Sequence, residues 1–81
     1  MIPTIHINGT SRERLLEALV NANDALIRAQ MAVAETAPNA RDYYPQGPDA
    51  IRHADREHLA RMQKLIDVRQ ELEDIAEAIC A

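Results

Sequence analysis

Basic, aromatic and histidine side chains gather in the middle of the sequence, between positions 41 and 61. Arginine forks hold phosphate groups, tyrosine rings stack on nucleobases, and histidines donate to polar ligand atoms. This combination suits a small anionic nucleotide, which the positive end of a following helix would also attract. The residues that we expect to form this ligand site are Arg41, Tyr43, Tyr44, Arg52, His53, Arg56, His58 and Arg61.

A structural role explains the same residues. The two tyrosines can close the tip of a hairpin, and the arginines can pair with the acids that lie among them. Those acids are Asp42, Asp55 and Glu57. Because they interleave with the arginines, and because the net charge is −4 at pH 7, we expect no general binding to DNA.

The residue spacing gives little support to metal binding or catalysis. His53 and His58 are five positions apart, so on a helix they point about 140° from one another instead of sharing a face. Ser11 has no base near it in the sequence, and Cys80 has no basic neighbour that would activate its thiol. We therefore expect no metal, no cofactor and no enzymatic activity.

The elements that must position these residues are predicted to be helical. The chain has 47% hydrophobic residues but no Phe or Trp and only two glycines, a composition that favours helix packing over a sheet. We expect one all-α domain, residues 1–81, that is an antiparallel two-helix hairpin. Its parts are an extended N-terminal arm (1–9), helix 11–36, loop 37–48 and helix 49–79. Thr10 and Glu13 have the spacing of a reciprocal cap for the first helix, and Pro38 ends that helix.

The second helix carries a coiled-coil seam in which apolar positions alternate by three and four. We expect the seam to consist of Ile51, Ala54, His58, Arg61, Leu65, Val68, Leu72, Ile75 and Ile79. A second, shorter apolar stripe on a neighbouring face contains Leu59, Met62 and Ile66.

The first helix shows more apolar circumference than one partner helix can cover. Its large apolar side chains span a wide arc, and a separate face carries alanines. Such an excess predicts self-association into a helical-bundle homo-oligomer, although alanines chosen for helix propensity would give the same pattern. The interface residues that we expect are Ile5, Ile7, Ala18, Ala25, Ala29, Ala32, Leu59, Met62 and Ile66.

Two amides, Asn23 and Gln30, lie seven positions apart inside the apolar arc of the first helix. Buried amides of this kind can fix register and oligomer state. The alternative is that both lie at the edge of the arc in contact with water.

The sequence also indicates where the protein works. No apolar run approaches the length of a transmembrane helix, and the N-terminal residues lack the basic and apolar regions of a signal peptide. The single cysteine is typical of a reducing compartment. We expect the protein to remain in the cytoplasm of the cell that makes it, without a membrane partner.

Two segments, IPTIHINGT at residues 2–10 and APNARDYYPQG at residues 37–47, resemble small, mostly uncharacterised proteins encoded by tailed bacteriophages and prophages. The likeness spans nearly the whole chain. It implies a phage accessory protein made in the host bacterial cytoplasm, and by analogy one that counters host defence.

The preferred function is therefore a non-enzymatic anti-defence protein that sequesters a small anionic, cyclic nucleotide signal. One alternative is a protein that blocks a host defence protein through the Leu59/Met62/Ile66 stripe or the alanine face of the first helix. A second alternative is a structural or scaffolding element of the virion.

Overall fold

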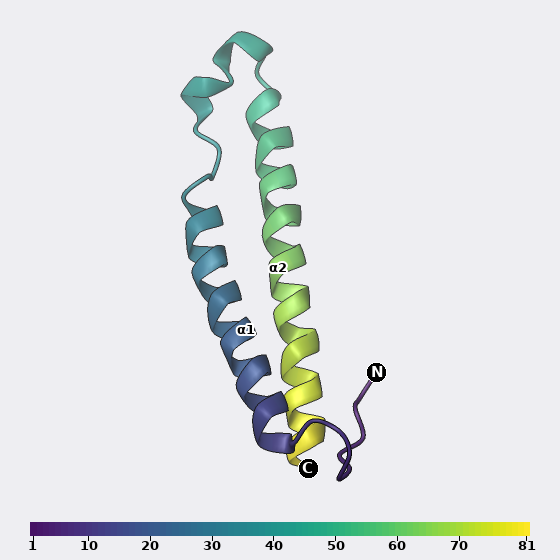
Figure 1. The fold of residues 1–81 in the computed structure, drawn as a ribbon. Coiled ribbons are helices and arrows are strands. Elements are labelled where there is room, and N and C mark those ends of the chain that lie inside the picture. The colour runs from purple at the N-terminus through teal and green to yellow at the C-terminus, as the bar shows by residue number, and fades with distance from the viewer.

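The computed structural model describes residues 1–81, and it consists of two long antiparallel helices joined by a compact tip (Figure 1). Helix α1 spans Arg12–Ala34 and helix α2 spans Ala50–Cys80, with the short 3-10 helices η1 (Ala40–Asp42) and η2 (Tyr44–Gln46) between them. The molecule measures 62 × 19 × 18 Å. The all-helical hairpin is confirmed. Neither helix combines the length and the hydropathy that crossing a membrane requires.

Helix α1 begins one residue later than the sequence predicts. Ser11 is the N-cap, and its side chain accepts a hydrogen bond of 3.2 Å from the backbone N–H of Arg14. The predicted reciprocal cap between Thr10 and Glu13 is wrong, because the residue three positions after the true cap is a base and cannot return the bond. Near the other end, Glu35 and Thr36 donate to carbonyls only three residues back, and the helix unwinds before Pro38.

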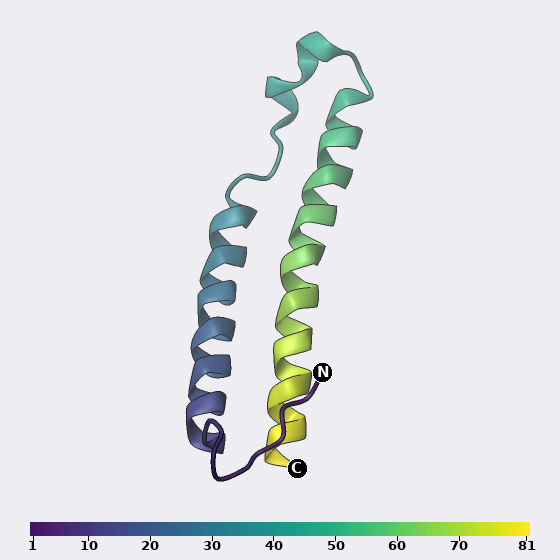
Figure 2. The ribbon, with the colours of Figure 1, turned by 45° about the vertical axis from the view of Figure 1, so that its right-hand side comes forward.

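The N-terminal arm forms no strand. Its first residues run beside the C-terminal turns of α2 (Figures 1 and 2), and it then turns tightly at Gly9, whose N–H donates to the carbonyl of His6 at 3.1 Å. Met1 and Ile2 border a hollow there with Leu72 and Ile75. Because the turn breaks the extended segment, Ile5 is half-buried whereas Ile7 is fully exposed.

The seam of α2 differs from the prediction in its second half. From His58 onward the covered positions are His58, Met62, Leu65, Arg69, Leu72, Ala76 and Ile79, with Ile75 half-buried at the edge. Arg61 and Val68, which were predicted in the seam, are exposed. Both sets satisfy a three-and-four spacing. The observed one keeps the charge of Arg61 in water and turns Arg69 toward α1.

Arg69 explains why the second set prevails. Its Nε donates to Asn23 Oδ1 at 3.1 Å and its Nη1 donates to Gln30 Oε1 at 2.7 Å. The two amides of α1 are thus half-buried acceptors for one guanidinium, and they set the register between the two helices of a single chain. At the far end Arg12 Nε donates to the carbonyl of Ile79 at 3.1 Å.

The interior of the hairpin is thin. Only Ile79 and His58 are buried, with 4% and 8% of their surface exposed. The other inward side chains are half-covered because two helices alone cannot enclose a core. Most of the apolar stabilisation that this chain could gain is therefore still unused in the single hairpin.

Candidate ligand site at the hairpin tip

Local backbone chemistry shapes the tip. Asn39 accepts from the N–H of Arg41 at 3.0 Å and so begins η1, and Pro45 lies in the first turn of η2. Gly47 then adopts φ 105°, a conformation that side chains with a Cβ rarely take. The positive φ ends η2 and redirects the chain into α2.

An apolar hollow of about 510 Å³ lies in the tip, on the inner side of the two tyrosines. Its lining consists of Ala40, Tyr43, Tyr44, Gly47, Pro48 and Ile51. Tyr44 is 73% exposed and Tyr43 is half-buried, so both rings have surface free for stacking. The hollow falls in the size range of small-molecule sites.

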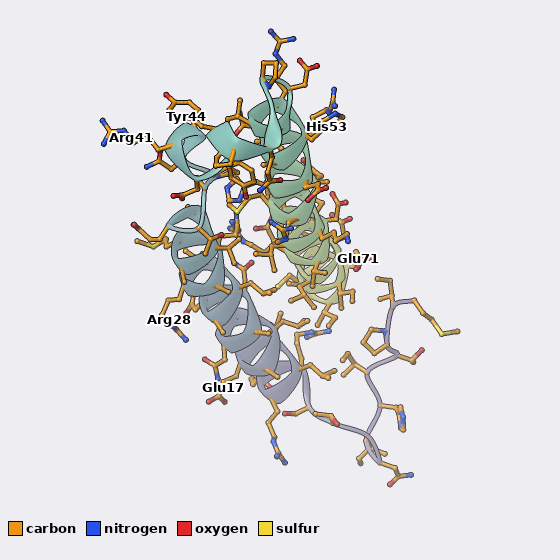
Figure 3. The ribbon with its side chains drawn as sticks, turned by 90° about the horizontal axis from the view of Figure 1, so that it is seen from above. Glu17, Arg28, Arg41, Tyr44, His53 and Glu71 are labelled. Carbon is orange, nitrogen blue, oxygen red and sulfur yellow. The ribbon has the colours of Figure 1, made fainter.

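Arg41 directly follows Ala40, one of the lining residues, but does not itself line this hollow. It projects from the same side of the tip as Tyr44 (Figure 3), and its side chain is exposed and forms no ion pair with a carboxylate. A guanidinium that no carboxylate neutralises is free to bind an anion. Of the predicted site residues, Tyr43 and Tyr44 line the same hollow, and Arg41 lies on the same side of the tip as Tyr44.

A second hollow, of about 470 Å³, opens between the tip and the first turns of α2. Its lining includes one histidine, His53, and two carboxylates, Asp49 and Glu57. Two carboxylates in one hollow repel an anion, so this hollow does not suit a phosphate group.

None of the basic residues of α2 lines the first hollow. His53 lies on the opposite side of the tip from Arg41 and Tyr44 (Figure 3). Arg56 Nη2 donates to His53 Nδ1 at 2.7 Å, because a guanidinium can only donate. Arg52 is 3.9 Å from Asp49, and Arg61 is exposed farther along the helix. These side chains do not converge on one point.

His58 belongs to the interior. It is buried in the seam, and its Nδ1 is enclosed without a hydrogen-bond partner. The spacing of three and four had already placed it there, and that position keeps it away from a ligand at the tip.

The residues that sequence reasoning missed are the small and apolar ones that form the walls of the first hollow. Ala40, Pro48 and Ile51 carry no chemical signal of their own. The sequence signal that could have predicted this hollow is the run Pro45-Gln46-Gly47-Pro48, because it forces a compact turn beside the tyrosines.

The expected interface residues divide between two sides of the hairpin. Leu59 and Ile66 are exposed on one flank of α2, and Met62 is half-buried in the seam. Three exposed alanines lie on the opposite flank of the hairpin, on α1. They are two positions along the chain from the exposed large apolar residues of that helix, and two positions correspond to a rotation of about 200° around the helix axis. They are Ala18, Ala25 and Ala32, while Ala29 is half-buried.

No family model, curated protein or solved structure matches this chain. The structure brings no three histidine, cysteine or acidic side chains together in a group that could hold a metal ion. The class that the fold defines is a thin helical hairpin with large exposed apolar side chains and an aromatic, arginine-flanked tip.

Proposed function

We propose that this chain is a non-enzymatic phage accessory protein that captures a small anionic, cyclic nucleotide at its hairpin tip. The observation that carries the proposal is that Arg41 pairs with no carboxylate and projects from the same side of the tip as Tyr44, which borders an apolar hollow together with Tyr43. The arginine would hold phosphate and the rings would stack on the base. In the host cytoplasm such binding would withdraw a defence signal.

The proposed working form is a homo-oligomer. Its support is the thin interior, together with large apolar side chains that remain exposed on both helices. A chain of 81 residues with so little buried surface gains stability most readily by covering that surface with another copy.

Calorimetric titration with cyclic di-AMP and cyclic di-GMP tests the ligand proposal. We expect binding that Arg41→Ala and Tyr44→Ala each weaken at least about tenfold, the loss of one charge-assisted contact or one stacking partner. Arg28→Ala is the matched control, because Arg28 is an exposed arginine on α1 that projects away from the tip (Figure 3). Equal weakening by the control, or no heat with either nucleotide, would contradict the proposal.

A second candidate function is inhibition of a host protein by direct contact. The observation in its favour is the exposure of Leu59 and Ile66, at 66% and 42%. If loss of activity in infected cells follows substitutions at these two residues and not at Arg41 or Tyr44, direct inhibition replaces nucleotide capture. Recovery of the protein from purified virions would instead support the scaffolding role.

A further inference from the structure

Five exposed apolar side chains lie on one side of the hairpin, which we call the apolar face. Its members are Val20, Ile27 and Met31 of α1 and Leu59 and Ile66 of α2. Each exposes between 36% and 67% of its surface. On a folded monomer, large apolar side chains that gather on one side mark a docking surface.

The members of the apolar face on α1 and those on α2 form two rows, and both rows lie on the same side of the seam between the helices. Val20 and Ile27 are seven residues apart and so share one flank of α1, as Leu59, Ile66 and Glu73 share one flank of α2. A small groove of about 100 Å³ joins the flanks, since Val20 and Glu73 both line it. The rows therefore form a single surface that crosses both helices.

The opposite side, which we call the arm face, has the N-terminal arm of the chain beside it. Met1 and Ile2 border an open hollow with Glu71, Asp74 and Ile75 of α2, and Met1 itself is fully exposed. Val68 is seven residues before Ile75 and shares that flank. The apolar face has no such segment beside it.

Charge along α2 is strongly asymmetric. The half nearer the tip, residues 50–64, carries four bases and two acids, a net charge of +2, whereas residues 65–81 carry one base and five acids, a net charge of −4. Two lines of α2 residues on the side of the apolar face, each in steps of seven, run in the same way from a base near the tip to an acid at the other end. One reads Arg52, Leu59, Ile66, Glu73 and the next reads Arg56, Gln63, Gln70, Glu77, in steps of seven from the tip.

We propose that the apolar face binds a second copy of this chain in the antiparallel direction, with α2 of one copy lying along α2 of the other. The proposal rests on the proposed self-association and adds its surface and its direction. A two-fold axis near Ile66 brings the apolar rows together and sets Arg56 opposite Glu77 of the partner subunit. The parallel direction would place acid against acid over the last three turns of α2, and it is therefore disfavoured.

This arrangement leaves both tips free. The two tips project from opposite ends of the dimer, beyond the helices of the partner, because each tip precedes residue 50. Each copy then keeps its own Arg41, Tyr43 and Tyr44 site, and the dimer binds two ligands independently.

Two substitutions test the surface. Ile66 and Val68 expose 42% and 41% of their surfaces, but they are two residues apart and so lie on opposite faces. Ile66→Glu is expected to raise the dimer dissociation constant about a hundredfold or more, because it buries an unpaired carboxylate twice per dimer. Val68→Glu is expected to change it less than about threefold. Equal effects in sedimentation equilibrium would overturn the assignment of the face.

The single cysteine tests the direction without any substitution. Cys80 is exposed and lies fourteen residues beyond Ile66, so in the antiparallel dimer two nitroxide labels on it should be about 40 Å apart, at 1.5 Å per residue on each side of the axis. Double electron–electron resonance measures this separation. A distance under about 20 Å would show the parallel direction and overturn the proposal, while the self-association would stand. A wild-type chain that is folded and monomeric would overturn both.

Discussion

The apolar face and the arm face border the same two helices, yet only the arm face has the N-terminal arm of the chain beside it. On the arm face α1 presents small alanines, and the N-terminal arm lies across the end of α2. On the apolar face α1 and α2 present large side chains to water, among them Met31 at 67% exposure. The two faces thus differ in the size of the side chains that α1 presents to water and in the presence of the arm beside α2.

Arg69 determines which residues belong to each face. Arg69→Ala would leave the acceptors of Asn23 and Gln30 half-buried without a donor, and we expect a loss of about 1–2 kcal/mol in the free energy of unfolding. Urea unfolding followed by circular dichroism at a fixed protein concentration measures this loss. Arg28→Ala should change stability by less than about 0.5 kcal/mol. If Arg69→Ala left the free energy of unfolding unchanged, the guanidinium would not set the register.

Charge reversal tests the polarity of the apolar face. Arg56→Glu alone should weaken the dimer about tenfold, since it places an acid opposite the acid of the partner's Glu77. Combining it with Glu77→Arg should restore most of the affinity. Fluorescence anisotropy of labelled chain at low salt follows both effects, and raising the salt should shrink them. If the double variant is weaker than the single one, the two residues do not face each other.

The arm face should respond to changes in the arm and not to changes in the dimer. Ile2 is 48% exposed, and Ile2→Ser removes its contact with the end of α2 at a cost of about 0.5 kcal/mol in stability. The dimer dissociation constant should stay within about twofold of wild type. Hydrogen exchange of the last turns of α2 reports the loosening. If the dimer dissociated after this change, the arm would have to be part of the interface.

Much of the fold could be predicted from the sequence, because Pro38, Gly47 and the long apolar periodicity are local signals. The seam could not, since Arg61 and Val68 fit the spacing as well as Met62 and Arg69 do. Only the amides across the helix pair decide between the two sets, and their partner is 46 and 39 residues away.

The site was predicted in part for a similar reason. Arginine and tyrosine content pointed to the tip, where Tyr43 and Tyr44 share one hollow and Arg41 lies on the same side as Tyr44. The side from which each residue projects depends on two 3-10 turns and on one positive φ at Gly47. Such turns leave no periodic pattern in the sequence. The position of His53 on the opposite side of the tip could therefore not be predicted.

The mass of the wild-type chain in dilute solution tests the central claim most directly, namely that the apolar face is covered by another copy. Sedimentation equilibrium of the 9.1 kDa chain should give twice that mass or a higher multiple, with a helical circular dichroism spectrum. A single-chain mass with the same helical spectrum would contradict the account.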